Sequence, residues 1–343
     1  MTNTSRFKSN LTICTLITLS FLFRFVNATE LAKARPELMT IDGHLIHVAF
    51  WGSTQSIDKP WVVLISGPID SWHSDTAWFA ALAPMLAKDF RVIAIDRAGL
   101  VSATKNAPIG YTHFATDMAQ ILKKFSIEGA TLVAFATANL TAIHLLNDEQ
   151  QHAVSNVVLI DPDVLTEFSI ARYSADVDPF KQNLDAYLDY IKQGKYTARV
   201  EQKNQTDLDT LNALAAGLEV EWDYVLRLMK ARLDVINQLN LFKEIAFYQD
   251  DLNAAAKLTW PQNIPTLIID TQFEQAYIEQ AEDPTKKQEL ITWQQDAKQY
   301  YQSLAALSSH NQYLELDSRA HLFQFEQPQR LMGLINTLRK KVD

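Results

Sequence analysis

The sequence predicts an α/β protein built on a mostly parallel sheet. From Glu37 onward, short β-branched apolar runs alternate with longer amphipathic stretches, the pattern that gives parallel strands joined by helical crossovers. After Pro162 this alternation gives way to about a hundred residues of helical periodicity with very little Gly or Pro. The alternation resumes at Pro265. We therefore expect a helical insertion within a strand-and-helix core.

The individual elements follow from local patterns. Residues 38–41 and 44–51 flank Asp42-Gly43, which is typical of the two-residue turn of an antiparallel hairpin. Four later runs are continuously apolar, as in strands buried on both faces; they are residues 61–66, 91–96, 131–135 and 156–161. Further strands are expected at residues 265–270 and 312–316, and helices at residues 286–307 and 326–341.

Within the helical insertion, six apolar residues follow helical spacing and predict one apolar stripe on a single helix. These residues are Trp222, Val225, Leu226, Met229, Leu233 and Ile236.

The N-terminus, residues 1–28, has the form of a secretory signal peptide. Basic residues precede an apolar run over residues 11–23, and Ala28 closes a segment of small residues that suits a signal peptidase. The run is shorter than the roughly 20 residues of a spanning helix, and Arg24 interrupts its end. Cleavage is therefore favoured over anchoring. We expect an exported protein, periplasmic or secreted, with no stable membrane span.

The composition excludes several classes of site. Cys14, the only cysteine, lies in the signal peptide, so the mature chain has no disulfide and no thiolate metal site. The eight histidines are scattered without metal-type spacing, and the nine glycines form no phosphate-binding loop. We therefore expect neither a metal nor a cofactor.

The charge of the chain also bears on its partners. The signal peptide holds three basic and no acidic side chains, so its removal takes the net charge from −9 to −12. An acidic surface repels polyanions, and no nucleic-acid motif is present. A nucleic-acid partner is not expected.

Four short motifs lie at the ends or the beginnings of predicted strands, in order along the chain. They are Leu64-Ile65-Ser66-Gly67-Pro68, Asp96-Arg97-Ala98-Gly99 followed by Ser102, Ile264-Pro265-Thr266-Leu267, and Ser318-Arg319-Ala320-His321 followed by Glu326-Gln327-Pro328. With the element order, they resemble the α/β-hydrolase fold with a helical cap. The resemblance implies a mostly parallel eight-stranded sheet flanked by helices, with the cap inserted after strand 6. It implies a core of residues 29–162 and 259–343 and a cap of residues 163–258.

The resemblance places the nucleophile elbow at residues 134–138, Ala-Phe-Ala-Thr-Ala, where the family shows Gly-x-Ser-x-Gly. Ala136 stands at the position of the serine, and a methyl group cannot attack a carbonyl. Ala134 and Ala138 are still small, which the sharp turn requires. Thr137 is the nearest hydroxyl, but its use as the nucleophile would put larger residues at the two small positions.

The oxyanion loop also differs from that of the family, and this difference again argues against serine hydrolysis. One oxyanion donor of the resembled fold is the backbone N–H just after a His-Gly pair. Here Ser66 replaces that histidine, Gly67 follows, and Pro68 stands at the donor's position without an N–H.

The remaining polar candidates are better preserved. His321 matches the family's general base. The carboxylate that would orient it is expected to be Glu274, in the loop after the seventh strand, with Asp270 as the alternative. His73 is a further candidate for the cavity mouth, the other interpretation being a solvated loop histidine.

These departures favour a pseudoenzyme of the esterase and lipase-like lineage that keeps a capped pocket and binds a small apolar or ester-like molecule. The alternative is an active hydrolase, lyase or oxygenase-like enzyme in which His321, oriented by Glu274, acts as general base without a covalent intermediate. A third hypothesis is an interaction protein that docks through its acidic surface or its cap. No specific motif supports this hypothesis.

Overall fold

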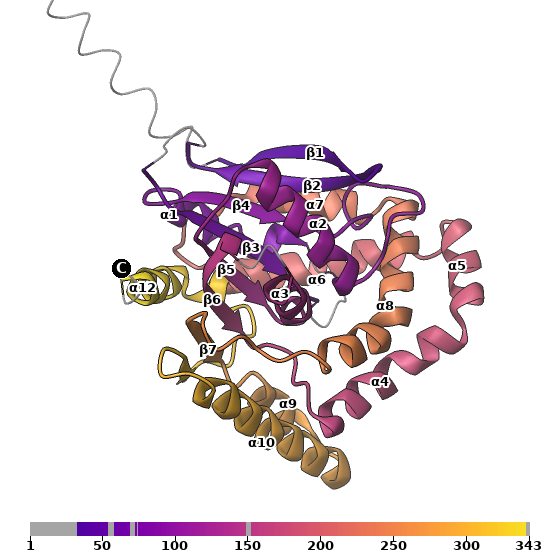
Figure 1. Cartoon of the computed structure of the whole chain (residues 1–343). Coiled ribbons are helices and arrows are strands. Elements are labelled where there is room, and N and C mark those ends of the chain that lie inside the picture. Colours follow the sequence, from indigo (N-terminus) through magenta and orange to yellow (C-terminus); the bar gives the residue numbers. More distant parts are fainter. Residues whose placement is uncertain (1–32, 54–57, 69–72, 74, 149–151, 341–343) are drawn as a thin grey trace, which may run out of the picture.

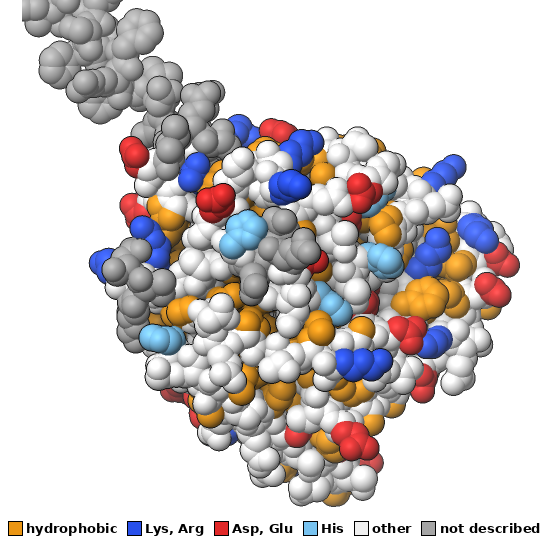
Figure 2. Space-filling view, in the orientation of Figure 1, with side chains coloured by type: hydrophobic (Ala, Val, Ile, Leu, Met, Phe, Trp, Pro, Cys, Tyr) orange, Lys and Arg blue, Asp and Glu red, His pale blue; other side chains and the backbone are white. Residues whose placement is uncertain are grey.

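The structure is a computed structural model that describes residues 33–53, 58–68, 73, 75–148 and 152–340 (Figure 1). The predicted signal peptide, residues 1–28, lies outside the described residues. Among the helices that are described, none combines the length and the apolar character needed to cross a membrane. Acidic and basic side chains are interspersed over the face of the molecule shown in Figure 2.

The described residues form one eight-stranded sheet in the order β1-β2-β4-β3-β5-β6-β7-β8. The pairs β1–β2 and β2–β4 are antiparallel and all other pairs are parallel, which confirms the predicted sheet. The strands are β1 (Arg35–Ile41), β2 (His44–Trp51), β3 (Trp61–Ser66), β4 (Arg91–Ile95), β5 (Ala130–Phe135), β6 (Val154–Ile160), β7 (Thr266–Asp270) and β8 (Gln312–Glu315).

Local chemistry explains the hairpin and the central strands. Asp42 and Gly43 both have positive φ, 43° and 84°, as a two-residue hairpin turn requires, and Ile41 pairs with His44 across it. Every residue of β3 and β5 is buried, because helices cover both faces of the sheet. Alternate residues of each strand therefore enter two separate cores.

The core helices divide between the two faces. On one face α2, α3 and α10 pack against the sheet, and on the other lie η2, α1 and α12. Their bounds, with those of the two short helices near the C-terminus, are η2 (Thr76–Phe79), α1 (Ala83–Leu86), α2 (Tyr111–Lys124), α3 (Ala138–Leu146), α9 (Glu274–Gln280), α10 (Pro284–Ala306), α11 (Phe323–Glu326) and α12 (Pro328–Arg339).

Five helices occupy the chain between β6 and β7, within residues 163–258. They are α4 (Glu167–Gln182), α5 (Leu184–Lys192), α6 (Thr197–Leu214), α7 (Trp222–Ala231) and α8 (Val235–Ala255). In Figure 1, α4, α5 and α8 form the pink-to-orange arm beside the sheet. A buried ion pair joins this arm to the core, since Arg97 Nε lies 2.7 Å from Glu244 Oε2 of α8.

The single apolar stripe predicted in this region is wrong. Helix α7 ends at Ala231, and α8 begins at Val235 with Asp234 as its N-cap, whose side chain accepts a hydrogen bond from the Ile236 N–H at 2.7 Å. Leu226 is 51% exposed. The N-cap interrupts the helix, so the spacing that the stripe assumes does not continue through it.

Candidate functional site

The turn between β5 and α3 has the geometry of a nucleophile elbow. Ala136 stands at its apex with a φ of 50°, in the left-handed region that a non-glycine residue rarely adopts. The Ala136 N–H donates to the Ile160 carbonyl at 2.9 Å, and the Asn139 N–H donates to the Ala136 carbonyl at 3.2 Å. The turn therefore has the backbone shape of an elbow, with a methyl group at its apex.

The loop after β3 lies directly against this elbow. The Gly67 N–H donates to the Phe135 carbonyl at 2.7 Å, and a Cβ added at Gly67 would meet the Thr137 nitrogen at 2.4 Å. Pro68, the next residue, lines the cavity together with Thr137. Because proline has no N–H, only Thr137 of these two residues can offer a backbone donor to an oxyanion.

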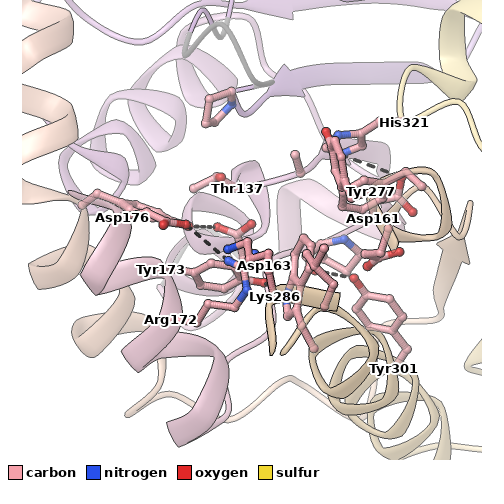
Figure 3. A pocket seen from close by; sticks show the side chains of 18 of the residues that line it. Thr137, Asp161, Asp163, Arg172, Tyr173, Asp176, Tyr277, Lys286, Tyr301 and His321 are labelled. Carbon is pink, nitrogen blue, oxygen red and sulfur yellow. Dashed lines mark hydrogen bonds and ion pairs between the residues drawn. The ribbon is translucent and has the colours of Figure 1, made fainter. Parts of the chain in front are cut away.

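The elbow faces a cavity of about 560 Å³ (Figure 3). It lies where parallel strands end, the usual place for a ligand in an α/β sheet. Five predicted site residues meet in its wall, while Gly67 supports the elbow next to it; the five are Pro68, Ala136, Thr137, Glu274 and His321. Side chains of the arm helices α4 and α8 and of α10 complete the wall, most of them aromatic.

His321 lies between aromatic rings rather than against a carboxylate. Its ring stacks on Phe273 with centroids 4.0 Å apart and planes 5° apart, and meets Phe135 edge-on at 4.8 Å. Its Nε2 atom is buried and makes no hydrogen bond to any described residue. Burial lowers the pKa of His321 to about 3, so the imidazole is neutral over the physiological pH range.

The acidic oxygen that faces His321 belongs to Asp161, at the end of β6. Its Oδ2 atom lies 3.9 Å from His321 Nε2, and the carboxylate accepts hydrogen bonds from the Thr271 N–H at 2.8 Å and hydroxyl at 2.6 Å. Glu274 makes no hydrogen bond or ion pair with His321 among the described contacts. The alternative, Asp270, accepts a hydrogen bond from the Tyr313 hydroxyl at 2.7 Å.

Sequence reasoning missed Asp161 and Asp163. Asp163 accepts hydrogen bonds from the side chains of Tyr248 and Thr137, and burial raises its pKa to about 6. Both aspartates directly follow β6, the neighbour of β5 in the sheet. An acid at the carboxyl end of the adjacent strand was the signal that could have indicated them.

His73 does not line the cavity, and it is not a solvated loop residue either, because it is only 4% exposed. Its Nδ1 atom lies 3.6 Å from Asp207 Oδ2. Nearby, Arg232 joins Asp75 to the same Asp207, at 2.6 and 2.8 Å. The prediction for His73 is therefore corrected, because this buried group of charges holds the ring away from the cavity.

Among the described residues, no three His, Cys, Asp or Glu side chains are grouped so that they could hold a metal ion.

The fold and the elbow define the class of protein. The chain belongs to the alpha/beta hydrolase family, whose model matches residues 62–334. Similar solved structures include the enol-lactonase from Burkholderia xenovorans LB400, with 15% identity, 89% of this chain and 100% of that chain covered, and a TM-score of 0.54. A search of curated proteins found no match.

Two further similar structures are of proteins with different chemistry. The epoxide hydrolase CorEH shares 14% identity over 91% of this chain and 100% of that chain, with a TM-score of 0.59. An AqdC variant, described in the recognition and ring-cleavage of the Pseudomonas quinolone signal, shares 13% identity over 89% and 100%, with a TM-score of 0.54. At such identities these likenesses show the fold alone.

Proposed function

We propose that this chain is a non-hydrolytic member of the family that binds a small molecule in the cavity without turning it over. The observation that carries the proposal is Ala136, which stands at the apex of an intact elbow and faces the cavity with a methyl group. Without a nucleophile at this position, no acyl-enzyme can form there.

The residues around Ala136 also support the proposed loss of hydrolysis. Pro68 removes one expected oxyanion donor, a loss that costs a typical acyl-transfer enzyme about 3 kcal/mol of transition-state stabilisation. His321 lacks the hydrogen-bonded carboxylate that orients a catalytic imidazole. Three separate components of serine hydrolysis are therefore weakened together, while the cavity itself is kept.

The alternative function uses His321 as a general base without a covalent intermediate. The position of its ring in the wall of the cavity, 3.9 Å from Asp161, favours this alternative. Against it, an efficient general base has a pKa near the working pH, and burial lowers the pKa of His321 to about 3. Binding without turnover is therefore the better supported function.

We also propose that the protein acts after export, since residues 1–28 have the basic, apolar and small-residue order of a signal peptide.

The proposed loss of hydrolysis can be tested with a fluorophosphonate probe and a panel of short-chain esters. We expect no labelling of the wild-type protein and ester turnover equal to the buffer background. In the Ala136→Ser variant we expect turnover to stay at that background, because the serine would lack an oxyanion donor from Pro68 and because His321, whose pKa burial lowers to about 3, is too weak a base to activate it.

A His321→Ala variant serves as the matched control for this experiment. Turnover by the wild-type protein that disappears in His321→Ala would contradict the proposal and favour the alternative function. Thermal unfolding of each variant verifies that it is folded.

A further inference from the structure

The wall of the cavity holds more acid than its own cations neutralise. Arg172 is paired with Asp176 at 3.3 Å and with Glu289 at 3.7 Å, and Lys286 also lies 3.7 Å from Glu289. Figure 3 shows Arg172 and Asp176 on the side of the cavity opposite His321. Both cations of the wall therefore have a carboxylate partner on α4 or α10, although the buried Arg172 Nε atom makes no hydrogen bond to any described residue.

The three other carboxyl groups of the wall have no Lys or Arg partner among the described ion pairs. Asp161 and Asp163 receive hydrogen bonds only from neutral groups, those of Thr271 for the first and of Tyr248 and Thr137 for the second. A buried carboxylate without a counter-charge is costly. This part of the wall therefore favours any ligand that carries positive charge.

Glu274 is the carboxyl of this group with the fewest hydrogen-bond partners. It is 2% exposed, lines the cavity, and its carboxyl interacts through hydrogen bonding only with its own backbone amide. Burial, with the negative charge of Asp270 adding to it and the Arg172 guanidinium only partly opposing it, raises the pKa of Glu274 to about 8. At neutral pH this carboxyl is mostly protonated, and a cation beside it would favour its ionised form.

Aromatic rings meet at steep angles next to this carboxyl. Phe273 and Trp293 are 5.7 Å apart at 80°, Phe273 and Tyr277 6.0 Å apart at 89°, and Tyr173 and Trp293 6.2 Å apart at 87°. The face of an aromatic ring attracts a cation, and His321 covers only one of the two faces of Phe273. The wall already holds one such contact, because the Arg172 guanidinium lies 4.3 Å from the centre of the Trp293 ring.

We propose that the cavity binds a small organic amine as its ammonium ion, with the charge beside Glu274 and an aromatic or aliphatic body among the rings. This inference rests on the proposed binding function. An anionic ligand would find both cations of the wall already partnered by Asp176 or Glu289, and it would oppose rather than favour the ionisation of Glu274. Binding the ammonium ion at neutral pH releases a proton from Glu274 to the buffer, because the pKa of that carboxyl falls when the cation arrives.

Isothermal titration calorimetry with 2-phenylethylamine and its neutral analogue 2-phenylethanol tests this inference. In the wild-type protein at neutral pH, we expect the amine to bind at least about tenfold more tightly than the alcohol. Titrations in two buffers of different ionisation enthalpy should show proton release for the amine and none for the alcohol.

The Glu274→Gln variant should bring the two affinities to within about threefold and abolish proton release. It should bind the alcohol like the wild type, which shows that the cavity is intact. Glu282→Gln, which makes the same substitution at an exposed position, is the matched control and should behave like the wild type.

Two outcomes separate this inference from the function on which it rests. If the alcohol binds as tightly as the amine, or if the preference survives in Glu274→Gln, the cavity binds small molecules but the amine assignment is overturned. If neither probe binds to the wild-type protein, both the amine assignment and the binding function are overturned.

Discussion

Replacement of Arg232 by methionine is expected to lower the free energy of unfolding by about 3–5 kcal/mol, the usual cost of removing one partner from a buried ion pair. The guanidinium donates to Asp75 at 2.6 Å and to Asp207 at 2.8 Å, and it lies 4.9 Å from the centre of the Trp78 ring. Methionine fills much of the space but leaves two buried carboxylates without their cation. Urea unfolding measures the loss.

Arg227→Met is the matched control, because Arg227 is exposed on helix α7, of which Arg232 is the C-cap. We expect it to change the free energy of unfolding by less than about 0.5 kcal/mol. An equal loss in both variants would contradict the assigned role of the buried cluster.

The loss of unfolding free energy in Arg232→Met should also depend on pH. Burial opposes the ionisation of Asp75, but the Arg232 guanidinium outweighs burial and holds the pKa of Asp75 below its ordinary value of 3.8. A depressed pKa stabilises the fold above that value, and the stabilisation is lost as the pH falls through the folded-state pKa. The difference between wild type and variant should therefore be largest at neutral pH and shrink below 3.8. If the difference in unfolding free energy stayed constant down to acidic pH, the role assigned to the ion pair between Arg232 and Asp75 would be contradicted.

Gly67→Ala is expected to destabilise the protein by about 3 kcal/mol or more, at the upper end of what overpacking costs. The new Cβ would lie 2.4 Å from the Thr137 nitrogen and 2.9 Å from both the Ala138 nitrogen and the Phe135 carbonyl oxygen. All three are backbone atoms of the elbow, so no side-chain rotation can relieve the contact. Thermal unfolding measures the loss.

Gly333→Ala provides the control for Gly67→Ala. Gly333 lies within helix α12, and a Cβ there would meet no atom within 4 Å. Since alanine is the better helix former, this variant should be more stable than the wild type by up to about 1 kcal/mol. Wild-type stability in Gly67→Ala would show that the elbow and the loop after β3 are not in the contact described.

Much of the fold could be predicted because its signals are local. The apolar run of β3, residues 61–66, agrees with the observed bounds Trp61–Ser66, and the Asp42-Gly43 turn pairs the strands in the expected register. The apolar stripe was the exception, because helical spacing alone cannot reveal that Asp234 caps a new helix. Periodicity does not detect the end of one helix and the start of the next when the residue types stay similar.

The sequence by itself determined that Ala136 occupies the elbow and that Pro68 has no N–H, since these statements depend only on which residue stands at which place in an ordered set of motifs. Tertiary structure decided which carboxylate faces His321, where His73 lies, and that the wall of the cavity is acidic and aromatic. Those properties depend on contacts between residues far apart in the chain, such as Asp161 with His321 and His73 with Asp207. No local pattern encodes such distances, because they are set by how the arm helices and the strand ends pack together.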